Sequence, residues 1–439
     1  MVVRSKGQEQ LAPVGAAIAC CVISLVSAVI APAEESRTAA GKPAEGEVDV
    51  FLGDPKFDLQ DLFTGDRFAN VLVATDGSVL AFWGVSNMRL RRSRDGGSTW
   101  EDPQQLPIPA LFDGNVMVDE NTGDLLAVSL EMGKDIQWRS HDQGETWTED
   151  QTVLKPNEVM KWLERTGMNQ RVSREGLGNR DDGYWMRTSH GESGITLRHG
   201  KHKGRLVLYA AFRPHSRTHP SDREPVDAIY SCAIYSDDGG ATWQVSGFFP
   251  EGYTEEAGLA ELHDGRIYYN SRSHRGYHAA SRSRELPEEA SLRRIAWSYD
   301  GGQSWEDLAI SRVLPDGGGY GRGYGMMGGL VRLPVKNRDV LIFSNTDTAG
   351  GAREKMTVWA SFDGGRTWPV KRLVHAGPGA YSSMAAGRPE TASEGWIYLQ
   401  FEGGTEHRYD GCKIARFNLA WLLEGEPTGD GEVPEWLSR

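Results

Sequence analysis

The stretch Ser93-Arg94-Asp95-Gly96-Gly97-Ser98-Thr99-Trp100 decides the fold, because its pattern Ser-x-Asp-x-Gly-x-Thr/Ser-Trp occurs five times in the chain. An Asp side chain accepts backbone N–H bonds inside a tight turn, and a Gly supplies the positive φ that closes the turn. The Trp then begins the next strand and packs its ring against a neighbour. Each copy is interpreted as a turn between two strands. The Asp residues of the five copies, Asp95, Asp142, Asp238, Asp300 and Asp363, are predicted to be structural and not catalytic.

Six further turns, each followed by an apolar run, alternate with these copies. Asp76-Gly77, for example, precedes the run 79–83. The other five are Thr122-Gly123, Lys203-Gly204, Asp264-Gly265, Arg338-Asp339 and Glu394-Gly395. Two hairpins in series make a four-stranded antiparallel sheet. Six such sheets without helical crossovers predict an all-β, six-bladed β-propeller, and residues 48–63 are expected to supply the strand that closes the last blade.

The composition agrees with many short strands, since the 439 residues include 53 Gly and 14 Trp. A net charge of −13 argues against a nucleic-acid partner. Beyond residue 33 the cysteines are Cys232 and Cys412, which are interpreted as two buried thiols in preference to a disulfide. No zinc-binding cysteine or histidine motif occurs, so neither a metal nor a cofactor is expected.

The N-terminus has the pattern of a signal peptide. Arg4 and Lys6 precede an apolar run over 11–31, and small residues follow at Ala31 and Ala33. We therefore expect a signal peptide over 1–33, with an uncleaved membrane anchor as the alternative. A linker is expected over 34–49, the propeller over 50–425 and a tail over 426–439. This organisation predicts a secreted or periplasmic protein.

Three segments depart from the strand pattern. Residues 155–190 show no clear strand, and they are expected to hold a short helix at 158–165 and a long loop. An insertion at 284–294 has helical character, and the Gly-rich segment 317–329 is expected to be a loop.

Strand counting brings six polar residues to the end of the propeller opposite the turns. The residues Arg67, Glu256 and Tyr381 precede first strands, whereas Arg272, Arg353 and Glu402 follow second strands. Three guanidinium groups beside two carboxylates and a phenol predict a site for an anion.

These residues carry a resemblance to the sialidase (neuraminidase) family, and more closely to its bacterial and lysosomal type. The five copies resemble that family's Asp boxes. Further matching segments come in the family's order: 191–195, 256–262, 270–272, 343–345 followed by Arg353, and 381–382 followed by Glu402. The resemblance implies an arginine triad of Arg67, Arg272 and Arg353, a nucleophilic Tyr381 with Glu256 as its base, and a Glu402 that orients Arg67.

The implied activity is that of an exported glycoside hydrolase, which releases sialic acid or a related acidic sugar from a sialylated or other acidic glycan with retention. A phenol suits a substrate that carries a carboxylate at its anomeric carbon, because it is neutral until it attacks. The family's acid/base Asp lies between the second and third strands of the first blade, where this chain has 84–88 without a carboxylate. The chain also has Arg67-Phe68-Ala69 where the family has Arg-Ile-Pro.

Proton donation is therefore left open among Asp66, Glu192 and His190. Two alternatives follow from this departure. The chain is then a hydrolase of another anionic glycan, or a binding propeller without turnover.

Overall fold

The computed structural model describes residues 46–85, 87–109, 115–130, 135–165, 170–171, 183–215, 229–273, 292–316, 325–348 and 352–437. All of these residues belong to one compact unit, residues 39–439. The expected signal peptide and most of the linker lie outside the described residues, as do 274–291 and 317–324. Within the described residues, no helix is long and apolar enough to cross a membrane.

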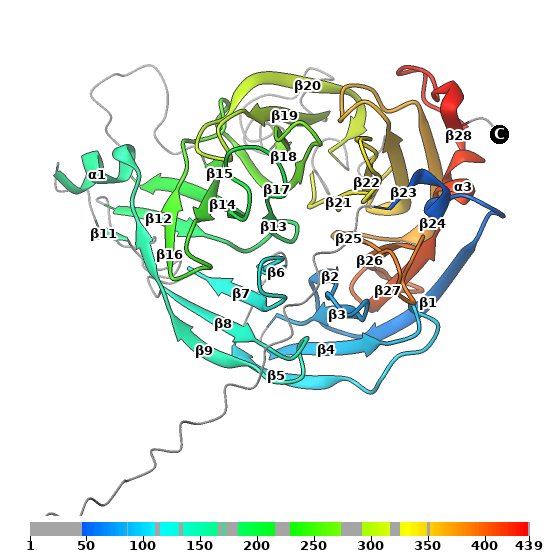
Figure 1. Cartoon of the computed structure of the whole chain (residues 1–439), viewed down its shortest axis with the longest axis horizontal. Coiled ribbons are helices and arrows are strands. Elements are labelled where there is room, and N and C mark those ends of the chain that lie inside the picture. Colours follow the sequence, from blue (N-terminus) through cyan, green and yellow to red (C-terminus); the bar gives the residue numbers. More distant parts are fainter. Residues whose placement is uncertain are drawn as a thin grey trace, which may run out of the picture. The chain divides into compact units, whose positions relative to one another are not determined.

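Six antiparallel sheets follow one another around a ring, as the sequence predicts (Figure 1). Blade one contains β2 (Ala69–Val73), β3 (Val79–Trp83), β4 (Asn87–Ser93) and β5 (Gln104–Pro109). Blade two contains β6 (Val116–Val118), β7 (Leu125–Ser129), β8 (Ile136–Ser140) and β9 (Thr148–Gln151). Blade four contains β17 (Thr254–Glu261), β18 (Ile267–Ser273), β19 (Leu292–Ser298) and β20 (Glu306–Pro315).

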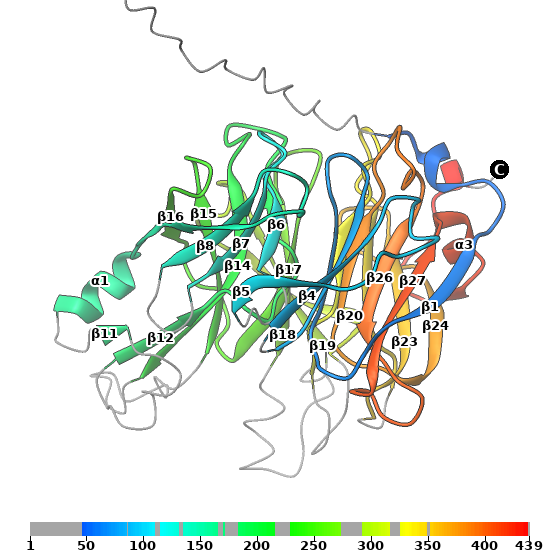
Figure 2. The same ribbon diagram turned by 90° about the horizontal axis from the view of Figure 1, so that it is seen from below.

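Blades five and six recruit strands from the two ends of the described chain. Blade five contains β21 (Leu330–Arg332), β22 (Leu341–Thr346), β23 (Glu354–Ser361), β24 (Val370–Pro378) and β28 (Glu426–Pro427). Blade six contains β25 (Ser382–Ala386), β26 (Ile397–Glu402), β27 (Gly411–Phe417) and β1 (Phe57–Thr64). Strand β1 pairs antiparallel with β27, from Phe57 opposite Phe417 to Thr64 opposite Gly411. Figure 2 shows the two strands side by side, so the predicted closing strand is present within 57–64.

The five Ser-x-Asp copies are turns between the third and fourth strands of blades one to five. In the first copy, Ser93 Oγ donates to Asp95 Oδ1 over 2.8 Å and Thr99 Oγ1 donates to Asp95 Oδ2 over 2.7 Å. Burial alone would raise the pKa of Asp95, but bonds from Thr99, Ser93 and backbone N–H groups lower it to about 2. The copies at Asp142, Asp238, Asp300 and Asp363 repeat these two side-chain bonds.

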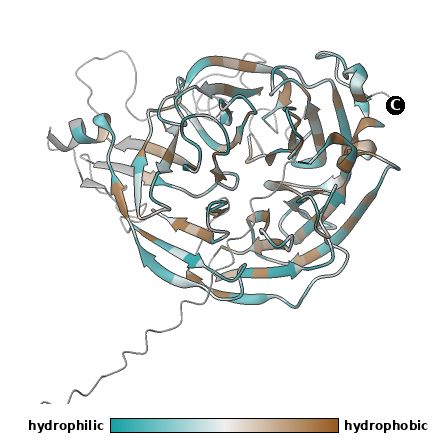
Figure 3. Ribbon diagram, in the orientation of Figure 1, coloured by the Kyte–Doolittle hydropathy of each residue, from teal (hydrophilic) through white to brown (hydrophobic). Residues whose placement is uncertain are grey.

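Apolar side chains of neighbouring blades pack together and hold the ring. One cluster joins Leu80 and Phe82 of blade one to Leu125 and Trp138 of blade two. Hydrophobic and hydrophilic residues alternate on many strand segments (Figure 3), whereas every residue of the inner strands β2 and β17 is buried, because the blades pack on both faces of these strands. Cys232 and Cys412 are both buried and are not joined in a disulfide.

Blade three departs from the expectation that 155–190 lacks strands. Its outer strands are β14 (Leu206–His215), β15 (Tyr230–Ser236) and β16 (Thr242–Val245), and β10 (Val153–Lys155) joins β16. Its inner strand consists of two pieces, β12 (Gly183–Arg187) and β13 (Ile195–Thr196), which both pair with β14, and β11 (Gln170–Arg171) pairs with β12. Helix α1 (Glu158–Arg165) has the predicted bounds. The interruption at 188–194 carries two of the candidate proton donors.

The boundaries of the propeller also differ from the expectation of 50–425. A 3-10 helix at Val48–Phe51 buries Phe51 in the core, and Gly46 bridges to Val335. At the other end, α3 (Leu419–Leu423) is followed by β28, which pairs with β24, and the 3-10 helix Glu435–Leu437 buries Leu437. Of the expected tail, residues 426–427 thus add a strand to blade five, and Leu437 packs in the core.

Candidate active site

Tyr381 and Glu256 form a close pair at one end of the ring, although they come from blades six and four. Tyr381 Oη donates to Glu256 Oε1 over 2.6 Å. The phenol ring is 6% exposed and the Glu256 side chain is 3% exposed. Burial raises the pKa of Tyr381 well above its usual value, and the neighbouring Glu256 raises it further. The phenol is therefore neutral in this state, with a carboxylate in position to take its proton.

Glu256 is held by an unusual backbone rather than by its position before a strand. The sequence predicts a position ahead of the first strand of blade four. Glu256 instead lies inside β17, at a β-bulge between Glu255 and Ala257. Its φ of 56° is in the left-handed region, where a non-Gly residue is strained. Tyr209 Oη accepts the bond from Glu256 N over 2.8 Å. The bulge sends Glu255 and Glu256 to different partners.

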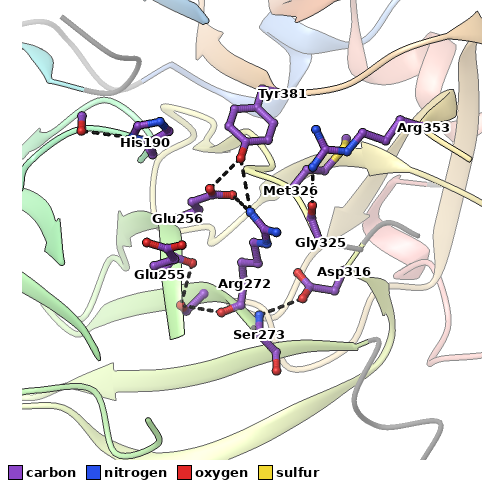
Figure 4. A network of polar contacts seen from close by, with 12 residues as sticks. His190, Glu255, Glu256, Arg272, Ser273, Asp316, Gly325, Met326, Arg353 and Tyr381 are labelled. Carbon is purple, nitrogen blue, oxygen red and sulfur yellow. Dashed lines mark hydrogen bonds and ion pairs between the residues drawn. The ribbon is translucent and has the colours of Figure 1, made fainter. Parts of the chain in front are cut away.

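The three arginines surround the Tyr381 side chain (Figure 4 shows Arg272 and Arg353). Arg272 Nη1 donates to Tyr381 Oη over 3.3 Å and also pairs with Glu256. The guanidinium of Arg67 lies 5.3 Å and that of Arg353 lies 5.2 Å from the centroid of the Tyr381 ring. We call the group formed by these three arginines, Glu256, Tyr381 and Glu402 the arginine–tyrosine cluster.

Glu402 anchors one corner of the cluster. Its carboxylate accepts from Arg67 Nε over 2.9 Å and Nη2 over 3.3 Å, and from the backbone N–H groups of Phe68 and Tyr381. Burial would lower the pKa of Arg67, but the charge of Glu402 raises it, so the guanidinium is kept charged. The six residues chosen from the sequence are thus brought together, and their roles stay predictions.

Arg353 differs from the other two arginines in its partners. Its Nη2 donates to Gly325 O over 2.8 Å and its Nη1 to Tyr409 Oη over 3.4 Å. Among the described residues, its buried Nε has no hydrogen-bond partner. A buried N–H donor without an acceptor costs free energy, and a bound carboxylate supplies acceptors to such a group.

The three candidate proton donors have different surroundings. Asp66 accepts from Arg67 N and Val85 N over 3.0 Å each and pairs with Arg89. Glu192 is 2% exposed and accepts bonds from backbone and Ser383 donors between the inner strands. Neither the Asp66 nor the Glu192 carboxyl group is therefore positioned to donate a proton beside Tyr381.

His190 is the candidate that lies beside the phenol. Its ring is 6.4 Å from the Tyr381 ring and 5.0 Å from the Phe68 ring, edge-on to both. Arg187 Nη1 lies 2.7 Å from His190 Nδ1. Because a guanidinium only donates, Nδ1 accepts this bond and the neutral ring carries its proton on Nε2. The ring is then a hydrogen-bond donor, and the described contacts assign leaving-group protonation to none of the three candidates.

Two residues of the site, Arg187 and Tyr409, are not among the candidates predicted from the sequence. Arg187 is buried between His190 and Glu255, and no strand pattern marked this segment. Tyr409 lies under Arg67, whose guanidinium is 4.2 Å from its ring centroid. Tyr409 lies between β26 and β27, in the connection that begins after Glu402, so strand counting contains a signal for it.

Chemically, the cluster is able to hold an anion and to form a bond from Tyr381. The arginines supply forked donors for a carboxylate, and the Tyr381–Glu256 pair supplies a nucleophile with its base. In the described part of the chain, no group of three or more His, Cys, Asp or Glu residues is arranged to hold a metal ion.

Comparison with known proteins shows what this chain is similar to. The BNR/Asp-box repeat family matches residues 234–245. A sialidase from Micromonospora viridifaciens is 29% identical to this chain, over 90% of the chain and 60% of that protein. A sialidase from Bacteroides fragilis (strain YCH46) is 28% identical, over 65% of the chain and 48% of that protein.

The chain is thus similar to sialidases and carries the BNR/Asp-box repeat.

The same fold is found in solved structures of other proteins. The Hadza microbial sialidase Hz136 superposes with a TM-score of 0.59 at 21% identity, covering 82% of this chain and 66% of that one. An intramolecular trans-sialidase from Ruminococcus gnavus superposes with a TM-score of 0.53 at 14% identity, covering 82% of this chain and 95% of that one. The chain spans between about half and two thirds of the length of the two sialidases to which it is similar.

Proposed function

We propose that this protein is a retaining exo-sialidase, which removes a terminal sialic acid from an acidic glycan with Tyr381 as its nucleophile. The observation that carries the proposal is the 2.6 Å bond from Tyr381 Oη to Glu256 Oε1 within the ring of three arginines. A sialic acid carries its carboxylate on the carbon that is attacked. The arginines would bind this carboxylate next to the phenol oxygen, and a neutral phenol would approach it without charge repulsion.

Two displacements account for retention. In the first, Tyr381 Oη bonds to the anomeric carbon while the glycosidic C–O bond breaks, and the phenol proton passes to Glu256. An aryl leaving group departs as a phenolate, whereas a sugar oxygen takes up a proton from solvent. In the second, water attacks the same carbon while the bond from that carbon to Tyr381 Oη breaks, the proton of the water leaves to solvent, and Tyr381 regains its proton from Glu256. Each displacement inverts the carbon, so the configuration of the product is that of the substrate.

Hydrolysis of 4-methylumbelliferyl sialoside tests this proposal. We expect release of the fluorophore by the purified protein and a loss of at least about 100-fold in Tyr381→Phe, because that variant keeps the ring but has no nucleophile. Tyr299→Phe is a matched control, since Tyr299 is 55% exposed and bonds to Asp307 outside the cluster. No release by the wild-type protein contradicts the proposal.

The alternatives give other outcomes in the same experiment. A hydrolase of another anionic glycan releases nothing from the sialoside but cleaves one of a panel of uronic-acid or keto-acid glycosides. A binding propeller cleaves none of them, yet binds sialic acid saturably in calorimetry, and Arg353→Ala weakens this binding.

We also propose that the protein is exported. The basic residues, apolar run and small residues over 1–33 support this, because a signal peptidase recognises that pattern. Expression of the full chain followed by N-terminal sequencing of the secreted material is the test. A mature N-terminus near residue 34 is expected, and a chain that stays in the cells with Met1 intact contradicts export.

A further inference from the structure

Glu192 lies where the inner strands of the blades converge, in the segment that interrupts the inner strand of blade three (Figure 1 shows these strands around the centre). It forms part of the lining of a cavity of about 200 Å³ between those strands. The neighbouring Gly191 has no room for a side chain, since a Cβ there would lie 2.2 Å from the ring of Tyr209. The segment therefore packs tightly, and Glu192 is directed inward among the blades.

The Glu192 carboxylate accepts four hydrogen bonds from three blades. Ser193 N and Ser383 Oγ donate to Oε1 over 3.0 and 2.6 Å. Leu330 N and Met384 N donate to Oε2 over 3.1 and 3.0 Å. Ser383 Oγ itself accepts from Val71 N over 3.1 Å, so its own proton is directed to Glu192. A carboxylate has about four acceptor positions, and all are used here.

Hydrogen bonds of Glu192 reach the segments that carry both members of the Tyr381–Glu256 pair. Ser383 and Met384 lie two and three residues after Tyr381, and the Glu192 carboxylate holds both of them. Glu192 N donates to the carbonyl of Ala257, the residue after Glu256, over 2.9 Å.

Blade five separates the blades of Tyr381 and Glu256 in the ring, and it is tied to the same carboxylate through Leu330 N. Gly258 permits this approach, because a Cβ there would lie 2.8 Å from Leu330 Cβ and 3.4 Å from Glu192 Cβ.

We propose that Glu192 is a positioning residue for the nucleophile and its base: its carboxylate holds the strand that follows Tyr381, its backbone N–H holds the Glu256 strand, and the residue so sets the distance between the two side chains. The expected effect on kcat rests on the proposed function, whereas the expected effect on the distance between Tyr381 and Glu256 does not. Glu192 touches neither reacting atom, so it acts through Tyr381 and Glu256.

Glu192→Gln is the test variant, because it keeps the size of the side chain. An amide has one oxygen, so it cannot accept from three backbone N–H groups, and its NH₂ group faces a donor. Glu261→Gln is a matched control: Glu261 lies in the same strand as Glu256 and lines the same cavity. Its carboxylate accepts from the backbone N–H groups of Arg198 and His199, which follow β13.

Steady-state hydrolysis of 4-methylumbelliferyl sialoside gives the first measurement. We expect kcat of Glu192→Gln to fall at least about tenfold with KM within about threefold, since displacement of reacting groups by a fraction of an ångström costs rate rather than affinity. Glu261→Gln is expected to keep kcat within about threefold. Equal losses of kcat in the two variants would overturn the proposal, because they would reflect general destabilisation.

Crystal structures of the two variants give a measurement that needs no turnover. In Glu192→Gln the distance from Tyr381 Oη to Glu256 Oε1 is expected to exceed about 3.5 Å, and in Glu261→Gln to stay within hydrogen-bond range. An unchanged distance in Glu192→Gln overturns the proposal, even if kcat falls. A wild-type protein without activity overturns the proposed function, and the distances then decide the positioning role alone.

Ser383→Ala provides a second variant if Glu192→Gln does not fold. It removes one of the four donors and leaves the carboxylate in place. We expect a loss of kcat in the same direction but smaller, about threefold, with the same lengthening of the Tyr381–Glu256 distance. No change in either quantity overturns the proposal.

Discussion

Replacement of Glu261 by Gln is predicted to flatten the pH dependence of stability. Glu261 is 8% exposed, and burial raises its pKa from 4.5 to about 7, although bonds from Arg198 and His199 oppose the shift. The folded protein therefore binds a proton at this carboxyl more tightly than the unfolded chain does. The stability that this group contributes is complete below about pH 4.5 and is lost as the pH rises through about 7.

The size of the effect follows from the shift. A shift of about 2.5 units corresponds to roughly 3.4 kcal/mol, of which about 2.5 kcal/mol is lost between pH 5 and 8. With an unfolding entropy of about 0.8 kcal/mol/K for about 400 residues, the Tm of the wild-type protein should fall about 3 °C more over this range than that of the variant. The variant also loses one hydrogen-bond acceptor, and this loss lowers its Tm by an amount that is about the same at every pH.

Differential scanning calorimetry at half-unit steps from pH 5 to 8.5 measures this difference. The buried Glu192, whose pKa burial also raises to about 7, is present in both proteins and its contribution cancels. Glu149→Gln, at an exposed position of blade two, is the control and should follow the wild-type curve. If the wild-type and Glu261→Gln curves run parallel, the carboxyl is not buried as described here.

Three further predictions concern single residues. Arg353→Ala should lower kcat/KM roughly 10- to 100-fold through lost charge-assisted bonds to the substrate carboxylate; unchanged hydrolysis would exclude Arg353 from binding. Tyr409→Ala should lower kcat/KM about 2- to 30-fold, because its ring supports the Arg67 guanidinium at 4.2 Å, while Tyr409→Phe should keep activity within about threefold. Equal losses in the two Tyr409 variants would assign the effect to the hydroxyl. Asp363→Ala should cost about 1–3 kcal/mol in urea unfolding without changing KM, because its carboxylate accepts from Ser361 and Thr367 across the turn; an unchanged midpoint would contradict this.

The fold was predictable because its decisive signal is local. Each Asp box closes its own turn within eight residues, so the bonds around Asp95 need no knowledge of the rest of the chain. The inner strand of blade three was missed because its pairing is distant: Gly183 lies opposite His215 and Ile195 opposite Val207, with an interruption between. A broken strand whose partner lies elsewhere has no alternating pattern to find.

The candidate site was predictable in its membership but not in its side-chain directions. Strand counting collected Tyr381 and its partners, because residues at equivalent joins lie at the same end of a propeller. Strand counting does not distinguish Glu192 from His190, two positions apart, as the candidate proton donor. His190 has a φ of 64°, and this single left-handed residue helps to send one side chain beside Tyr381 and the other between the blades. No sequence pattern reports such a rotation.

Ring closure by β1 has a consequence for biosynthesis. Because Phe57 pairs with Phe417, β1 is synthesised early but cannot pair until β27 is synthesised near the end of the chain. Until then, β1 exposes unpaired backbone groups during translation, which invites association with other chains. Moving residues 57–64 to the C-terminus by circular permutation would make the two strands neighbours in time, and such a permutant should refold faster and aggregate less than the natural chain order.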